Sequence, residues 1–241
     1  MIFWLSLILV WAYMTGWYLF SLAKKRNDIA DTAWGIGFII LSLFCLVLNP
    51  TLKQLITFIL IFIWGFRLSN HIYKRNKNKP EDYRYEQFKK NSYIKVFMTQ
   101  GFLLILISFS YIFSQSKFNW FNILGIFVWI FGFAFESIAD AQLKKFISDA
   151  KNKGKIMQSG LWAYSRHPNY FGESCLWWGI WLLNLNFSQN WWSIIGPITI
   201  TYLITQVSGI PLLENKMSQN PEFKKYQNRV SVFIPWFPKK S

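Results

Sequence analysis

Charged residues are scarce in this sequence. Only 15% of the 241 residues are Asp, Glu, Lys or Arg, whereas soluble domains contain roughly 25%. Hydrophobic residues make up 53% of the chain, and apolar runs of about 20 residues recur along it, long enough to cross a hydrocarbon core of roughly 30 Å. The composition therefore excludes a soluble globular protein and predicts a polytopic integral membrane protein.

Histidine and cysteine are also scarce, which excludes several kinds of site. The chain has two histidines, too few for the histidine-rich di-iron centres of membrane desaturases and hydroxylases. Cys45 and Cys175 lie in separate apolar segments without ligand spacing, so we expect two small buried side chains. The GxG within Trp34–Phe38 lies in an apolar run without a βαβ context. We therefore predict no metal site and no soluble-type nucleotide fold.

Seven apolar segments are candidates for transmembrane helices. They lie at residues 2–22, 33–48, 52–72, 96–114, 120–139, 170–187 and 191–213. The first has no basic segment before it and no small-residue cleavage site, so we interpret it as a retained span. Because no repeat, soluble domain or low-complexity linker interrupts the chain, we predict one all-α membrane domain over residues 1–241.

The net charge of +15 is concentrated in alternate connections between these segments. Except for Lys53, Arg67 and Lys117, every Lys and Arg follows the first, third, fifth or seventh segment. The positive-inside rule then places the N-terminus outside and the C-terminus in the cytoplasm. A basic cytoplasmic face suits anionic headgroups, so we expect membrane lipids as partners and no nucleic acid.

Ionisable side chains at membrane depth are costly and mark candidate functional sites. Five lie in or at the ends of the predicted spans: Arg67, Glu136, Asp140, Glu173 and Glu214. All five lie toward cytoplasmic ends in the predicted topology, which indicates one polar pocket open to the cytoplasm. Glu136, Asp140 and Lys144 are spaced by four residues, so they share a face if the helix continues beyond the span. A salt-bridge ladder on a solvated helix end explains Asp140 and Lys144 equally well.

The stretch SRHPNYFGES, residues 165–174, places polar groups directly before an apolar run. Pro168 suits the first turn of a helix, where its missing N–H is not needed. A helix that begins near His167 directs free N–H groups toward the predicted pocket, an arrangement that binds phosphate. The local pattern thus predicts an anion site at this helix start.

Further residues of the same stretch fall on one side of the predicted helix. Asn169 and Glu173 are one turn apart and share a face, and Arg166 lies at the predicted mouth of the pocket. Gly172 permits the close approach of either a ligand or a second helix. The sequence leaves these two roles of the glycine open.

Several motifs together resemble the DUF1295 family. In the C-terminal half these are ADAQLKKF (139–146), GLWAYSRHPNYFGESCLWWGIWL (160–182) and YQNRVSVFIPWFPK (226–239). In the N-terminal half they are DTAWGIGF (31–38), WGFRLSNHI (64–72) and EDYRY (81–85). DUF1295 in turn resembles the C-terminal half of steroid 5-alpha-reductases and of the sterol C14 and C24(28) reductases. The resemblance covers nearly the whole chain and implies a seven-helix membrane reductase that takes NADPH from the cytoplasm.

The resemblance also implies where the cofactor binds. Residues 1–115 would form the substrate side and residues 116–241 the NADPH-binding part. The implied cofactor-binding positions and their neighbours are Arg67, Asp140, Lys144, Arg166, His167, Asn169, Tyr170, Glu173, Glu214, Tyr226 and Arg229. We expect the enzyme in the inner membrane if its source is bacterial and in the endoplasmic reticulum if it is eukaryotic.

The implied reaction is reduction of a carbon–carbon double bond, conjugated to a carbonyl, in an apolar steroid- or lipid-like substrate from the bilayer. A hydride passes to the electrophilic carbon while an acid polarises the carbonyl or protonates the adjacent carbon. The steroid-reducing members use a Glu and a Tyr from N-terminal helices, which have no secure match here. The candidate proton donors are Asp31, Tyr73 and Tyr85.

Two other functions share parts of this pattern. Isoprenylcysteine and phospholipid methyltransferases also carry RHPxYxG and bind S-adenosylmethionine through that region. Asn169, Glu173, the ADAQ segment and the seven spans favour the reductase instead. The third alternative is a non-catalytic lipid-binding membrane protein, against which the retained buried charges argue.

Overall fold

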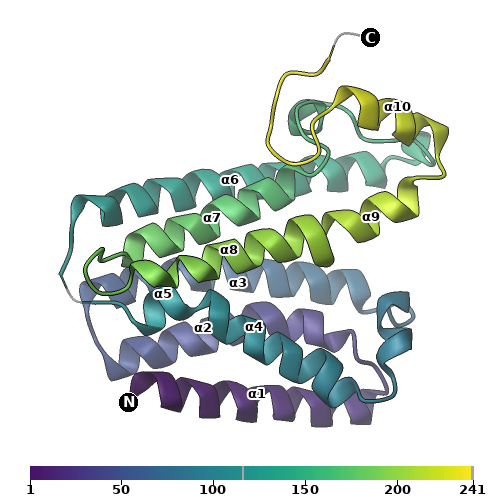
Figure 1. Ribbon diagram of the computed structural model, residues 1–241. Helices are drawn as coiled ribbons and strands as arrows, with labels where there is room; N and C mark the ends of the chain where they lie inside the picture. The colour runs from purple at the N-terminus through teal and green to yellow at the C-terminus, as the bar shows by residue number, and fades with distance from the viewer. Residues whose placement is uncertain (116, 240–241) are drawn as a thin grey trace. The chain divides into compact units, whose positions relative to one another are not determined.

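The computed structural model describes residues 1–115 and 117–239, and within them it forms helices and no strand. The α-helices, shown in Figure 1, are α1 (Ile2–Lys24), α2 (Ile29–Leu48), α3 (Leu52–Asn76), α4 (Thr99–Ile107), α5 (Phe109–Ile112), α6 (Trp120–Ser148), α7 (Pro168–Asn184), α8 (Ile195–Tyr202), α9 (Ile210–Met217) and α10 (Pro221–Arg229). Short 3₁₀ turns are η1 (Tyr83–Phe88), η3 (Ala150–Asn152), η4 (Gly160–Ala163) and η5 (Trp191–Ile194). Two π-helical turns are η2 (Tyr93–Met98) and η6 (Leu203–Val207).

Five helical segments in the described part of the chain are long and apolar enough to cross a membrane. They are Ile2–Lys24, Ile29–Leu48, Leu52–Asn76, Trp120–Ser148 and Trp191–Met217. Each coincides with a predicted span, so the prediction of an all-α polytopic membrane protein is confirmed. The predicted spans 96–114 and 170–187 correspond to a shorter apolar helix, Tyr93–Ile107, and to the 17 residues of α7. The count of seven spans and the orientation in the membrane stay predictions.

The chain divides into two compact units, which are described separately. Unit 1 comprises Met1–Asn122 and Leu183–Gly196, and unit 2 comprises Ile123–Leu182 and Pro197–Ser241. Unit 1 thus holds α1–α5. Unit 2 holds most of α6, α7 and α8, together with α9 and α10.

Glycines set the helix packing in unit 1. A Cβ added to Gly35 of α2 would lie 2.7 Å from the carbonyl oxygen of Gly65 in α3, so the two helices meet backbone to backbone. A Cβ on Gly37 would lie 2.4 Å from Leu104 of α4. The GxG of this segment is therefore a helix-packing feature, in agreement with our rejection of it as a nucleotide motif.

Buried polar side chains at the start of α3 donate to backbone carbonyls. Lys53, which is fully buried, donates from Nζ to the carbonyl of Lys117 at 2.7 Å. Gln54 donates from Nε2 to the carbonyl of Tyr111 at 2.6 Å, while its buried Oε1 accepts no hydrogen bond from the described residues. The two donated hydrogen bonds help the fold to tolerate polar side chains at this depth and give both residues a structural role.

In unit 2, α6 and α7 run antiparallel in close contact. A Cβ on Gly172 of α7 would lie 2.4 Å from the backbone nitrogen of Glu136, and one on Gly179 would lie 2.5 Å from that of Trp129. Gly132 of α6 is pressed equally closely against α7, 2.5 Å from the nitrogen of Leu176. The room at Gly172 is therefore filled by α6, which resolves the two roles that the sequence left open.

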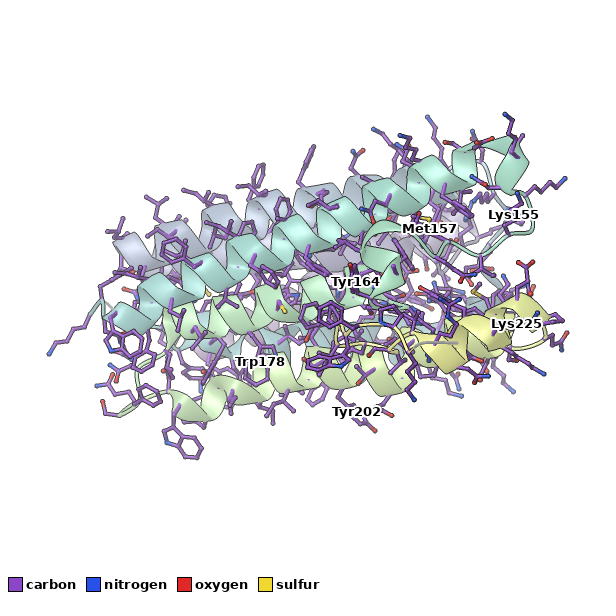
Figure 2. The ribbon with its side chains drawn as sticks, turned by 90° about the horizontal axis from the view of Figure 1, so that it is seen from above. Lys155, Met157, Tyr164, Trp178, Tyr202 and Lys225 are labelled. Carbon is purple, nitrogen blue, oxygen red and sulfur yellow. The ribbon has the colours of Figure 1, made fainter. Side chains whose placement is uncertain are left out.

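Local predictions about unit 2 also hold. The fifth predicted span continues as helix to Ser148, and α7 begins at Pro168. Side-chain hydrogen bonds join α7 to α8 through Thr201, whose Oγ1 lies 2.7 Å from Ser174 Oγ. Figure 2 shows Lys155 and Lys225 at the same end of unit 2, where many charged tips gather, and Trp178 farther along its helices. Within this unit the basic connections therefore lie at one end.

Candidate functional site

A polar seam lies where α6 and α7 face each other in unit 2. The antiparallel register brings Asp140 opposite Asn169, and Asn169 Nδ2 donates to Asp140 Oδ1 at 3.2 Å. A carboxylate can only accept, so the amide must turn its NH₂ group to Asp140 and its oxygen away. Asn169 Oδ1 is buried and accepts no hydrogen bond from the described residues. A buried acceptor without a donor is costly, so this oxygen is available to a donor group of a ligand or a water molecule.

Two further carboxylates extend the seam. Glu136, one turn before Asp140 on α6, is buried. Glu173, one turn after Asn169 on α7, is half-buried. The seam consists of Glu136, Asp140, Asn169 and Glu173, whose side-chain oxygens are acceptors for O–H and N–H donors. Lys144 lies exposed one turn beyond Asp140. The spacing of four residues predicted that Glu136 and Asp140 share a face of α6 and that Asn169 and Glu173 share a face of α7.

Arg166, three residues before Asn169, is fully engaged by the protein. Its Nε and Nη2 donate to the two carboxylate oxygens of Glu214 at 2.7 and 3.0 Å. Its Nη1 donates to the carbonyls of Gln227 and Val230 at 3.0 and 2.7 Å. The side chain is only 10% exposed. A bidentate, half-buried pair with two more acceptors makes Arg166 an anchor for α9, α10 and the chain beyond them.

His167 joins the same anchor. Its Nε2 lies 3.1 Å from Glu214 Oε1, and its ring stacks at 5.8 Å on that of Tyr170. Burial lowers the pKa of His167 and outweighs the opposing effect of Glu214. The neutral ring therefore carries its proton on Nε2, the only tautomer that can donate to the carboxylate.

Tyr226 completes a group that we call the C-terminal clasp: Arg166, His167, Glu214 and Tyr226. The buried Tyr226 hydroxyl donates to the carbonyl of Trp162, and burial raises the pKa of this phenol. Arg229, in contrast, is exposed at the end of α10. The structure thus brings the four clasp residues together, and their side-chain hydrogen bonds are made with other groups of the protein.

Two of the three candidate proton donors meet in unit 1. Tyr85, buried on η1, donates its hydroxyl to Asp31 Oδ1 of α2 at 2.5 Å. Arg84 Nη2 donates to Asp31 Oδ2 at 3.1 Å and to Asp82 Oδ2 at 2.9 Å. We call these four residues the Asp31–Tyr85 cluster. The third candidate, Tyr73, is 52% exposed on α3, with the Lys77 ammonium 5.9 Å from its ring centre.

The electrostatics of this cluster favour a protonated tyrosine beside carboxylates. Burial raises the pKa of Tyr85 well above its usual range, and the charge of Asp31 raises it further. Burial acts to raise the pKa of Asp82, but hydrogen bonds from Arg84 outweigh it and lower that pKa. The sequence analysis missed Arg84 and Asp82, although the alternating charges of EDYRY were a signal for them.

The cluster is joined to a clamp between two connections of unit 1. Arg26 forms a bidentate pair with Asp28, with Nε and Nη2 at 2.9 and 2.7 Å from the carboxylate oxygens. Asn27 N donates to Glu81 Oε1 at 2.6 Å, which fixes the connection after α3 to the start of α2.

Arg67, the remaining predicted site residue, lies half-buried on α3.

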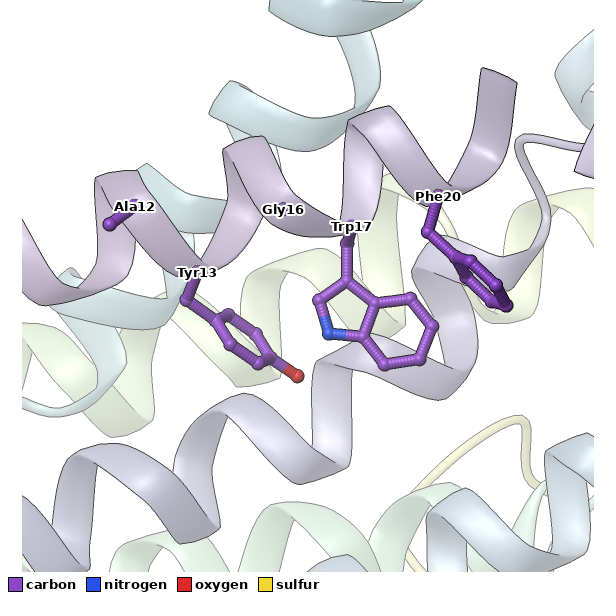
Figure 3. A pocket seen from close by; sticks show the side chains of 5 residues that line it. All are labelled: Ala12, Tyr13, Gly16, Trp17 and Phe20. Atoms are coloured by element: carbon purple, nitrogen blue, oxygen red, sulfur yellow. The ribbon is translucent and has the colours of Figure 1, made fainter. Parts of the chain in front are cut away.

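A separate hollow of about 430 Å³ lies along α1 in unit 1, lined by Ala12, Tyr13, Gly16, Trp17 and Phe20 (Figure 3). Tyr13 donates its hydroxyl to the carbonyl of Ala33 at 2.8 Å, so the hollow presents mainly ring faces. It contains none of the residues that the sequence singled out, and it has no ionisable group apart from the tyrosine. The hollow therefore offers no acid–base group other than a phenol that is already bonded to a backbone carbonyl.

The fold and these sites define a polytopic helical membrane protein with polar groups buried at helix contacts. The model of a family of proteins of unknown function, DUF1295, matches residues 17–230, and the chain belongs to this family. This confirms the resemblance inferred from the motifs. An uncharacterized protein of Schizosaccharomyces pombe is 24% identical over 212 residues, which cover 72% of this chain and 60% of that protein. No solved structure matches the chain.

Proposed function

We propose that the protein is a membrane-embedded reductase that uses NADPH to reduce a carbon–carbon double bond, conjugated to a carbonyl, in an apolar steroid- or lipid-like substrate. The observation that carries this proposal is the buried Oδ1 of Asn169, which accepts no hydrogen bond from the described residues and lies in a seam of carboxylates. Such a group of acceptors suits a ligand rich in O–H and N–H donors. Ribose hydroxyls and the carboxamide of a nicotinamide nucleotide are donors of this kind.

The residues of the seam fit the cofactor in separate ways. Asp140 and Glu173 would accept hydrogen bonds from ribose hydroxyls, while Asn169 Oδ1 would accept one from a hydroxyl or from the carboxamide. Lys144, exposed one turn beyond Asp140, would serve a phosphate as a point charge. Arg166 holds α9 and α10 in place, because its donors are already committed to Glu214 and backbone carbonyls.

Tyr85 of the Asp31–Tyr85 cluster is our candidate for the acid that the proposed reaction needs. NADPH, when bound, would supply the hydride for the electrophilic carbon of the double bond. Tyr85, kept protonated by burial, would donate its proton toward the carbonyl or the neighbouring carbon. Arg84, whose guanidinium carbon lies 5.9 Å from the Tyr85 ring centre, would stabilise the phenolate left behind. A proton from water then restores the tyrosine, so hydride and proton together saturate the bond.

Ligand-dependent thermal stability of the purified protein in detergent tests the proposal. A ligand that binds the native state raises the unfolding temperature. We expect NADPH to raise it in the wild type and to do so less in Asn169→Ala, while Asn228→Ala, an exposed asparagine on α10, responds like the wild type. Stabilisation by S-adenosylmethionine and not by NADPH would establish the methyltransferase alternative. Stabilisation by neither would favour a lipid-binding protein.

A second experiment tests the acid. With a long-chain enone as the probe substrate, Tyr85→Phe should retain stabilisation by NADPH but lose enone-dependent NADPH oxidation. A general acid contributes typically about 10²–10⁴-fold to a rate. Tyr73→Phe, an exposed tyrosine on α3, is the matched control and should keep the activity. Equal rates in both variants would exclude Tyr85 as the proton donor.

A further inference from the structure

Large apolar side chains after α10 remain exposed in the fold. Ile234, Trp236 and Phe237 are 62%, 71% and 78% exposed. Tyr164, which is 43% exposed, packs its ring edge-on against Phe237 with ring centres 6.1 Å apart. We call these four residues the aromatic platform. Most other exposed apolar side chains lie on the candidate membrane spans, whereas the platform lies outside them.

Hydrogen bonds hold the platform in a defined position within unit 2. Trp236 N donates to the carbonyl of Tyr164 and Lys239 N donates to that of Arg229, both at 2.9 Å. An isolated parallel bridge between Ser165 and Ser231 ties the same segment to the chain before α7. The apolar side chains are thus displayed by a fixed backbone, which indicates that something covers them.

The backbone of the platform is suited to the membrane interface. Pro235 and Pro238 flank Trp236 and Phe237 and have no N–H to desolvate. The N–H groups of Trp236 and Lys239 are already bonded. An irregular segment cannot enter the hydrocarbon core facing lipid, because its remaining polar groups need partners there. The headgroup region, where amphipathic Trp and Tyr rings are enriched, satisfies both constraints.

Cations lie beside the platform. Arg229 and Lys239 are both exposed, and the hydrogen bond between their backbones places them next to each other. The preceding helix α10 buries Phe223 and Tyr226, so one of its faces is used for packing and its charged residues remain outside. Apolar aromatic rings beside basic side chains are typical of segments that bind anionic membrane surfaces.

We propose that the aromatic platform docks into the headgroup–acyl boundary of a bilayer that contains anionic phospholipid, with Arg229 and Lys239 contacting the headgroup phosphates. The three most exposed side chains then become buried in the interface. The docked segment holds the chain before α7 through the Ser165–Ser231 bridge. This proposal is independent of the reductase reaction and survives if that reaction is disproved.

Site-directed spin labelling of the full chain tests the docking. Cys45→Ser and Cys175→Ser remove the two native thiols, and Phe237→Cys introduces the label at an exposed position. The protein is reconstituted in nanodiscs of phosphatidylcholine alone or mixed equally with phosphatidylglycerol. Collision rates of the label with oxygen, which concentrates in the membrane, and with a water-soluble nickel chelate are compared. Asn228→Cys, also exposed but polar, is the control position, and Ile234→Cys repeats the platform measurement.

In the mixed bilayer we expect labels at 237 and 234 to favour oxygen and the label at 228 to favour the chelate. Arg229→Gln with Lys239→Gln should shift the platform labels back toward the chelate, by about fivefold in the docking equilibrium for each charge lost. Chelate accessibility at 237 and 234 equal to that at 228 in both bilayers would overturn the proposal. Spin–spin coupling between copies with no dependence on lipid charge would overturn it in favour of a second copy of the chain.

Discussion

The two halves of the stretch SRHPNYFGES differ in how far the protein itself satisfies the hydrogen bonds of their side chains. In the first half, Arg166 and His167 direct their donors to Glu214 and to backbone carbonyls of the C-terminal region. In the second half, Asn169 has one partner, Asp140, and a buried oxygen that accepts nothing from the described residues. The first half of the motif therefore stabilises the fold, and the second half is the part that we propose binds a ligand.

The largest expected effect breaks the helix contact that holds the second half in place. Gly172→Leu would drive its side chain into the backbone of α6, because even a Cβ would lie 2.4 Å from Glu136 N. Overpacking of this kind costs about 1–3 kcal/mol or more. We expect a strongly lowered unfolding temperature in detergent. The control is Gly16→Leu on α1, where a Cβ meets nothing within 4 Å, and equal loss in both variants would contradict the account.

Arg166→Gln breaks the first half of the motif. It leaves Glu214 without its bidentate partner, and removal of one member of a buried ion pair costs about 3–5 kcal/mol. We expect α9, α10 and the following residues to loosen, which is measurable as faster proteolysis of the C-terminal region. Lys224→Gln, at an exposed lysine of α10, should leave the proteolysis pattern unchanged. Protection equal to the wild type in Arg166→Gln would refute the anchoring role.

Asn169→Ala should distinguish the roles of the two halves, because it should weaken NADPH binding much more than folding stability. The variant removes one neutral hydrogen bond to Asp140, so the unfolding free energy should fall by only about 1 kcal/mol. Binding of NADPH should weaken by about tenfold, as expected for one lost hydrogen bond with its partner left buried. Isothermal calorimetry measures the affinity, and a large loss of stability with unchanged affinity would reverse the assignment of the halves.

The smallest expected effect concerns pH. Burial lowers the pKa of His167, so below about pH 6.5 the unfolded chain takes up a proton that the folded chain refuses. Stability should therefore fall as the pH drops from 6.5 toward 5, by at most about 1.4 kcal/mol per pH unit. His167→Gln should flatten this part of the stability curve. A slope that persists unchanged in His167→Gln would assign the pH dependence to another group.

Features with a local signature were predictable from the sequence. Apolar length indicated the spans, proline indicated the start of α7 at Pro168, and the spacing of four residues indicated the shared faces of α6 and α7. Each of these inferences depends on residues that are close in the sequence, where helix geometry alone fixes which side chains are neighbours.

Pairings between distant segments could not be predicted in this way. Arg166 and Glu214 are 48 residues apart, and Tyr85 and Asp31 are 54 apart. Only the tertiary fold decides that the guanidinium of Arg166 meets a carboxylate and two carbonyls. The family resemblance implies that Arg166 lies beside the cofactor-binding positions, and only the fold adds its hydrogen bonds to Glu214 and to two carbonyls.

The most direct test of the central claim is the calorimetric titration of NADPH into the wild type, Asn169→Ala and Glu173→Gln under identical conditions. The account predicts binding to the wild type and weaker binding to both variants, at unfolding temperatures close to that of the wild type. Binding of equal strength to all three proteins would contradict the claim that the second half of the motif holds the nucleotide.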